Sequence, residues 1–141
     1  MFKNFFKKQK IDNLKSNNIL IFALLIHAAK ADENYTDTEK KIIIKAIMHL
    51  SELSFDKAKE LLILAEKKEE ESNQIIKFTG EIKKYSMEFR LKIIEIIWKI
   101  VYSDGTNDTY ESNLIRRICG LLYISDKDNG IIKTKVQNLL K

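Results

Sequence analysis

Apolar residues recur along most of this 141-residue chain at intervals of three and four, the spacing of one face of a helix. The chain contains no Pro and only 4 Gly, so it lacks the turn residues that a protein of many short strands would need. We therefore expect an all-α protein. The expected helices are Asn17–Ala31, Asp37–Glu52, Phe55–Lys68, Asn73–Tyr85, Met87–Tyr102, Thr109–Tyr123 and Asp126–Leu140.

Two of these helices are apolar enough to lie at the centre of the protein. Ile19–Ala29 is apolar except for His27, and it is far shorter than the roughly 20 residues of a membrane span. Met87–Tyr102 is apolar on nearly every side. Because a helix with so little polar surface belongs inside a bundle, we expect both to be central and His27 to be a core or rim residue.

An acidic turn between two apolar helices occurs twice. Asp32 and Asp104 are separated by 72 residues, and each is followed seven positions later by a glutamate, Glu39 or Glu111. An apolar run precedes each Asp, and an amphipathic stripe follows each Glu. Two copies are too few for a solenoid. The pattern predicts a single compact bundle of about seven helices with an internal pseudo-two-fold repeat.

The composition limits the partners. The chain carries 25 Lys and Arg against 20 Asp and Glu, a net charge of +5. A basic protein of this kind can bind nucleic acid, but here most Lys alternate with acidic residues, and no Arg stripe or interleaved aromatics are present. We therefore expect no nucleic-acid partner. The single Cys, Cys119, excludes an internal disulfide or a Cys-based zinc site, and we expect it to be a small core residue.

The first ten residues, Met1–Lys10, combine three phenylalanines with four lysines. We divide the chain into a basic-aromatic arm, residues 1–16, and a helical domain, residues 17–141. Such an arm can make a weak contact with an anionic membrane surface. Its phenylalanines can equally well dock on the core of the protein. It does not have the apolar segment and cleavage site of a signal peptide.

The acidic turns are the one place where the sequence suggests chemistry. Counted from Asp32 and Asp104, both turns begin like the calcium loop of an EF-hand. Both then lack the Gly at the sixth position, and both have Ile where the bidentate Glu of the twelfth position is required. Neither turn is an EF-hand.

Two roles remain open for these four carboxylates. Glu39 and Glu111 stand at the third position of their helices, where a carboxylate bonds the N-cap amide and faces the positive end of the helix dipole. Asp32 and Asp104 can accept backbone hydrogen bonds within the turns, although capping explains them less closely. Alternatively, the two turns bring the four carboxylates around a divalent cation, which prefers oxygen ligands.

The segment Tyr102–Ser125 reads Y-S-D-G-x5-E-x2-L-I-R-R-I-x-G-L-L-x-I-S, and Ala29–Glu39 reads A-K-A-D-x6-E. These motifs resemble the TerB-like family, which includes the tellurite-resistance protein TerB and the N-terminal domain of the co-chaperone DjlA. The resemblance covers almost the whole chain. Two departures stand out: Glu33 replaces the Gly expected after the first Asp, and no J domain follows, so a co-chaperone role is not supported.

The resemblance implies an all-helical domain of about seven helices. It also implies a bacterial cytoplasmic protein of stress or metal-related systems that works near the inner membrane, with Asp32, Glu39, Asp104 and Glu111 as candidate metal ligands. Fold membership does not supply a reaction.

We expect a non-enzymatic module that binds a protein partner, itself membrane-associated in some family members, with a divalent cation as the one candidate cofactor. The alternatives are a metal-dependent hydrolase that uses the clustered carboxylates, and a membrane-surface adaptor that uses the N-terminal arm. We identify no catalytic residue, because no nucleophile–base pair and no Gly-rich loop is visible.

Overall fold

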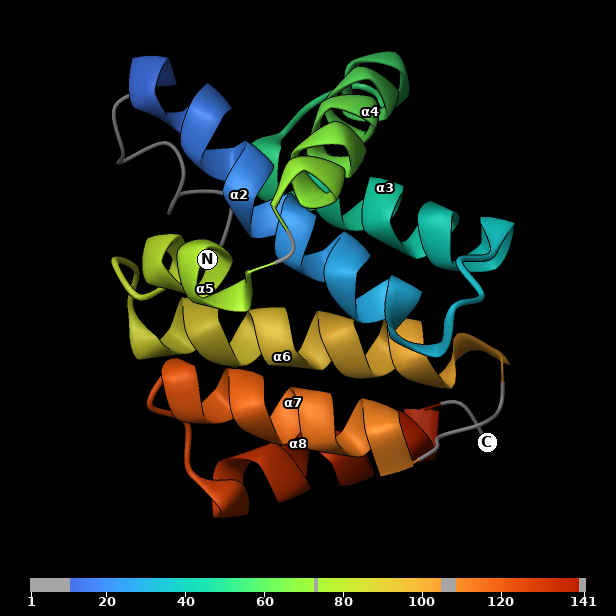
Figure 1. Cartoon of the computed structure of the whole chain (residues 1–141), viewed down its shortest axis with the longest axis vertical. Coiled ribbons are helices and arrows are strands. Elements are labelled where there is room, and N and C mark those ends of the chain that lie inside the picture. The colour runs from blue at the N-terminus through green and yellow to red at the C-terminus, as the bar shows by residue number, and fades with distance from the viewer. Residues whose placement is uncertain (1–10, 73, 105–108, 140–141) are drawn as a thin grey trace.

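The computed structural model describes residues 11–72, 74–104 and 109–139, and within them the side chains of residues 11–18, 32, 104 and 109–111 lie outside the description. The described residues form α-helices joined by short turns, with no strand among them (Figure 1). The elements are α2 (Ile11–Ala29), η1 (Lys30–Asp32), α3 (Asp37–Ser51), α4 (Phe55–Glu71), α5 (Ile75–Ile82), α6 (Met87–Val101), η2 (Tyr102–Asp104), α7 (Thr109–Leu121) and α8 (Asp126–Leu139), where η marks a turn of 3-10 helix.

The all-α fold predicted from the hydrophobic spacing is confirmed, and the helix boundaries agree closely with the expected ones. Two details differ. The helix α2 begins at Ile11, before the expected Asn17. The expected helix start at Asn73 predicts that Ser72 is its N-cap. Ser72 instead ends α4, and its N–H bonds the carbonyl of Lys68 at 3.2 Å. The residue before α5 is Gln74, which makes no side-chain cap.

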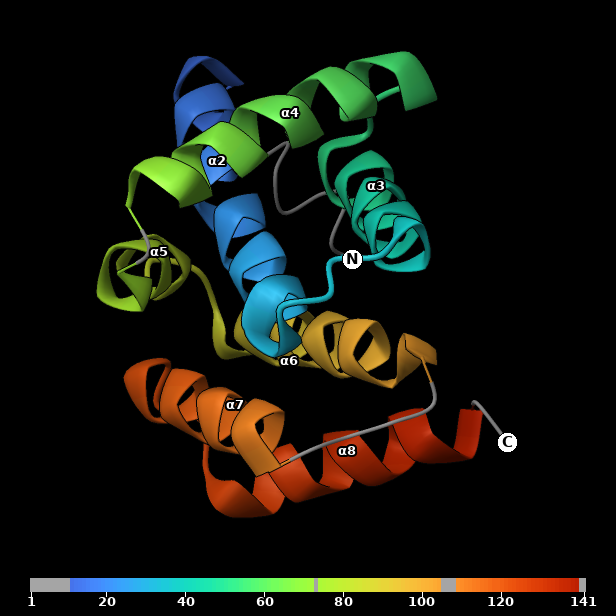
Figure 2. The same cartoon turned by 45° about the vertical axis from the view of Figure 1, so that its right-hand side comes forward.

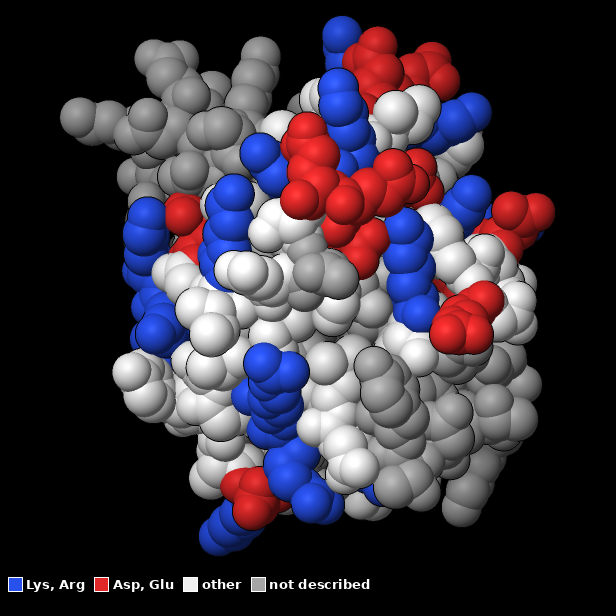
Figure 3. Space-filling view, viewed as in Figure 1, with Lys and Arg blue, Asp and Glu red and all other residues white. Residues whose placement is uncertain are grey.

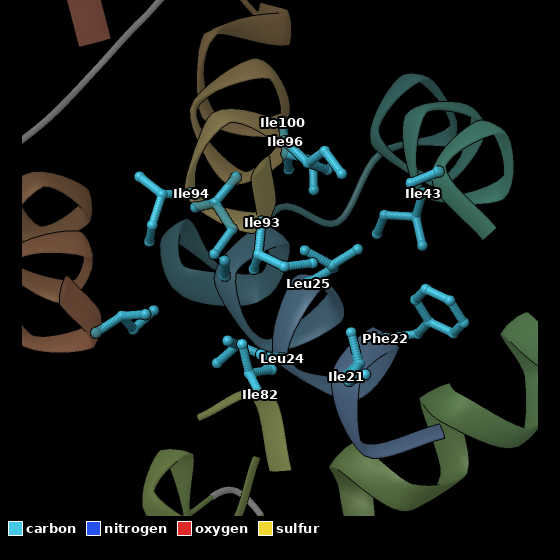
Figure 4. Close-up of a cluster of buried hydrophobic side chains, with 14 of the residues drawn as sticks. Ile21, Phe22, Leu24, Leu25, Ile43, Ile82, Ile93, Ile94, Ile96 and Ile100 are labelled. Carbon is cyan, nitrogen blue, oxygen red and sulfur yellow. The ribbon is translucent and has the colours of Figure 1, made fainter. Parts of the chain in front are cut away.

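The helix α2 lies at the centre of the first half. Its six consecutive residues Ile21–Ile26 are completely buried. The helix is buried on all sides because other helices surround it: α3, α4, α5, α6 and α7 all pack against α2. Figure 4 shows Leu24 and Leu25 of α2 among isoleucines of α3, α5 and α6.

The second central helix is α6, as its apolar sequence predicts. Its buried residues cover more than half of the helix circumference and include Phe89, Ile93, Ile97 and Trp98. It packs against α2 and α3 on one side and against α7 and α8 on the other (Figures 1 and 2). The core of the protein is therefore one continuous apolar cluster that runs from α4, past α2 and α6, to α8.

The internal repeat is visible in the order of the elements. Each half contains a central helix, a turn of 3-10 helix that ends at the repeated aspartate, and an amphipathic helix: α2, η1 and α3 in the first half, and α6, η2 and α7 in the second. Since α2 and α6 also pack against each other, the two halves share one core.

A buried polar contact joins α8 to α6. Trp98 is 1% exposed, and its indole N–H donates to Oδ1 of Asn129 at 2.9 Å. Its ring stacks on Tyr102, with ring centroids 5.5 Å apart. A buried indole N–H needs an acceptor, so Asn129 supplies from the first turns of α8 the one bond that the aromatic core of α6 requires.

We predict that Asn129→Ala lowers the free energy of unfolding by about 1–3 kcal/mol, because it leaves the buried N–H of Trp98 without this acceptor. Urea unfolding followed by the fluorescence of Trp98 would measure the change. Asn138→Ala on the exposed surface of α8 is the matched control, and it should unfold like the parent protein. Equal stability of the two variants would show that the Trp98–Asn129 bond does not hold α8 in place.

Candidate functional site

Both acidic turns have the same local form. The 3-10 turn η1 continues α2 and ends at Asp32, and η2 continues α6 and ends at Asp104. The helix that follows each turn carries the repeated glutamate in its first turn, Glu39 in α3 and Glu111 in α7. The side chains of Asp32, Asp104 and Glu111 lie outside the described ones, so their convergence on a cation stays a prediction.

The two turns are packed reciprocally. The turn η1 of the first half lies against α7 of the second half, and η2 of the second half lies against α3 of the first. Figure 1 shows the C-terminal ends of α2 and α6 on the same side of the bundle. The turn η1, which ends at Asp32, therefore lies beside α7, which carries Glu111. The turn η2, which ends at Asp104, lies beside α3, which carries Glu39.

Glu39 is the one candidate ligand whose side chain is described, and it caps its own helix. It is 2% exposed, and its Oε1 accepts from the backbone N–H of Thr36 at 2.8 Å. The hydroxyl of Thr36 in turn accepts from the backbone N–H of Glu39 at 3.1 Å. This is the reciprocal capping box expected from the sequence, and it accounts for the burial of a carboxylate at this position.

Glu33 follows Asp32, at the position where the second turn has Gly105. Its backbone is left-handed, with φ 63°, and its N–H bonds the carbonyl of Lys30 at 2.9 Å. The first turn therefore adopts with a glutamate the conformation that a glycine adopts at lower steric cost.

An ionic cluster lies beside the first acidic turn. Glu69 of α4 is 6% exposed, and its two oxygens bond Nδ1 of His27 at 3.1 Å and Nζ of Lys30 at 2.9 Å. The contact joins the end of α4 to the end of α2, just before Asp32. Three consecutive glutamates, residues 69–71, follow the expected helix end at Lys68 and predict a solvated helix end. That prediction is wrong for Glu69, which is buried and paired.

The sequence contained a signal for this contact. Glu69 continues the stripe of Ala58, Leu62 and Ala65 that α4 buries against the core. A carboxylate at a core position of a helix needs partners. His27 near the end of α2 and Lys30 at the start of η1 lie where they can supply them.

Tyr35 and Glu66 form a second polar contact between the first acidic turn and α4. The hydroxyl of Tyr35 donates to Oε2 of Glu66 at 2.8 Å, and Nζ of Lys40 lies 4.9 Å from the centroid of the Tyr35 ring. Burial, together with this hydrogen bond to a carboxylate, raises the pKa of Tyr35 far above its ordinary value. Tyr35 therefore stays protonated and holds the turn after Asp32 on α4.

The described residues offer few groups for catalysis. No three His, Cys, Asp or Glu side chains among them stand close enough to share a metal ion. Burial raises the pKa of Cys119 to about 12, so this thiol is protonated at neutral pH and is not an activated nucleophile. It is 1% exposed, as expected of a core residue.

Two sequence predictions concern the membrane. No helix in the described part of the chain has both the length and the apolar character that a span requires. The arm Met1–Lys10 lies outside the described residues, so its contact with a membrane surface stays a prediction.

We predict that Glu33→Gly raises the free energy of unfolding by about 0.5–1 kcal/mol, because glycine adopts the left-handed conformation without steric cost. Thermal and urea unfolding would measure the gain. Glu33→Ala is the control: it removes the same carboxylate but keeps a Cβ, so it should bring no gain. If alanine stabilised as much as glycine, the cause would be the lost charge and not the backbone.

Comparison with known proteins supports the family resemblance. The family model described as tellurite resistance protein TerB matches residues 18–134, which is most of the chain. Searches of curated proteins and of solved structures gave no significant match. The matched segment includes both acidic turns and ends within α8. The chain therefore belongs to the TerB family.

Proposed function

We propose that this chain is a non-enzymatic TerB-family module that mediates protein interaction in stress or tellurite resistance and binds a divalent cation at its two acidic turns. The reciprocal packing of η1 on α7 and of η2 on α3 is the observation that carries the proposal. A cytoplasmic location and a membrane-associated partner, both implied by the family resemblance, are part of it.

The chemistry of the turns favours a hard cation. Its ligands would be the carboxylates of Asp32, Glu39, Asp104 and Glu111. Carboxylates brought together repel one another, and calcium or magnesium would offset that repulsion with the oxygen ligands it prefers. A bound cation would also tie the first half to the second, since each turn lies against the other half.

The interaction surface we propose is the outer side of α4. Ile63 and Leu64 are 63% and 51% exposed there, although charged side chains otherwise dominate the α4 surface in Figure 3. Neighbouring apolar side chains within a charged rim are typical of a protein interface. The same helix carries Glu66 and Glu69, which connect it to the first acidic turn.

We predict that a divalent cation stabilises metal-stripped protein against heat. A cation at about 100 times its dissociation constant adds about 2.7 kcal/mol to the free energy of unfolding. For a domain of this size the melting temperature should rise by roughly 5–11 °C. Thermal unfolding with calcium, magnesium, manganese or zinc would measure the shift, and Asp32→Asn and Asp104→Asn should each abolish it.

Asp56→Asn is the matched control, because Asp56 is an exposed aspartate in the first turn of α4, away from both acidic turns. This variant should respond to the cation like the parent protein. Should no cation raise the melting temperature, while the Asp32 and Asp104 variants are merely less stable in every buffer, the carboxylates act only as caps and turn residues.

We further predict that the α4 surface determines which proteins the chain retains. In affinity capture, proteins that bind the parent chain should not bind the double variant with Ile63→Ser and Leu64→Ser. They should be kept with Ile131→Ser, which alters an equally exposed apolar residue on α8. Quantitative mass spectrometry would compare the three samples. Identical profiles would contradict the assignment of the interface to α4.

A further inference from the structure

A separate cavity of about 520 Å³ lies between α3, α6 and α8, a volume typical of small-molecule pockets. Residues of all three helices line it, and Figure 2 shows α6 between α3 and α8. Its walls are largely apolar. The apolar lining residues are Ile42, Ala46, Leu50, Ile96, Val136 and Leu139.

The rim of this cavity is cationic. Lys45 and His49 of α3 and Lys92 and Lys99 of α6 line it, and no carboxylate is among its described lining residues. Within the described part of the chain, the side chains of Lys45 and His49 have no hydrogen bond and no ion pair. The positive charge of Lys45 is therefore not neutralised by another described side chain.

Lys92 and Lys99 both pair with a carboxylate that does not line the cavity. Oxygens of Glu95 lie 3.4 Å from Nζ of Lys92, 3.2 Å from Nζ of Lys99 and 3.1 Å from Nζ of Lys135. Burial opposes the ionisation of Glu95, but its three lysine partners outweigh burial and hold its pKa below the ordinary value. Glu95 thereby holds the ammonium groups of Lys92 and Lys99 beside the cavity.

The positive charge of the rim also argues against a segment of this chain as the ligand of the cavity. The arm Met1–Lys10 could offer phenylalanines to an apolar cavity, but it carries four lysines and no acidic residue. Like charges disfavour its entry. A ligand with an aliphatic chain would match the apolar walls, and one negative charge would match the lysines of the rim.

We propose that the cavity between α3, α6 and α8 binds a free fatty acid, with its chain between the apolar walls and its carboxylate at Lys45 and the neighbouring cations. This proposal is independent of the cation site and of the α4 surface. A single aliphatic chain matches a cavity of this size, and a long, unbranched carboxylate can place its charge at the rim while its chain stays inside.

Isothermal titration calorimetry of the full chain with decanoate and dodecanoate, below their micelle concentrations and in metal-free buffer, tests the proposal. Binding should tighten by about fourfold for each added methylene, because each is removed from water. Dodecanol should bind more weakly than dodecanoate, since it offers no charge to the lysines. Saturation by dodecanoate at one molecule per chain is expected.

Two pairs of variants locate the site. Lys45→Glu should weaken dodecanoate binding by about tenfold, because an attraction becomes a repulsion. Lys77→Glu makes the same charge change on α5, which does not line the cavity, and should leave binding unchanged. Leu139→Asn should also weaken binding, whereas Ile63→Asn, at a residue equally exposed on α4, should not. All four residues are exposed, so the variants should fold.

Three results would overturn the proposal. The first is no binding of dodecanoate at millimolar concentration. The second is binding that the Lys45 and Leu139 variants leave unchanged, which would put the ligand elsewhere. The third is co-sedimentation with anionic phosphatidylglycerol vesicles that Lys45→Glu abolishes, without binding of monomeric dodecanoate. That result would reassign the cationic rim to a membrane surface.

Discussion

The complete burial of α2 is the constraint on which the rest of the structure depends. Six consecutive residues of one helix point in every direction around its axis, so no single partner can cover Ile21–Ile26. The chain meets this requirement by packing α3, α4, α5, α6 and α7 around α2. Each of those helices is amphipathic or nearly apolar, and α8 then closes the far side of α6. The arrangement of all the helices follows from the need to remove α2 from water.

Much of this architecture could be predicted from the sequence because the signals are local. Helical spacing, the capping pair Thr36 and Glu39, and the apolar character of Ile19–Ala29 each depend on residues close in sequence. The helix boundaries and the two central helices follow from them. The start of α5 was less predictable, because Ser72 can either begin one helix or end another, and the length of α4 decides between them.

The contacts of the charged residues could not be predicted in the same way. Glu69 stands in a run of three glutamates, and only its position on the buried stripe of α4 distinguishes it from Glu70 and Glu71. Its partners, His27 and Lys30, are 42 and 39 positions away in sequence. The cationic rim of the cavity likewise combines lysines of α3 and α6. Composition shows that lysines are abundant, but only the fold determines which of them lie next to an apolar wall.

The reciprocal packing of the two acidic turns has a consequence for how the halves depend on each other. Because η1 rests on α7 and η2 rests on α3, part of the surface under each turn belongs to the other half. A chain of half this length would leave part of its central helix and of its turn exposed to water. Two copies of such a half-chain could cover each other in the same arrangement, as a homodimer with a true two-fold axis. Joining the halves in one chain replaces that association by an intramolecular one, so folding no longer depends on protein concentration.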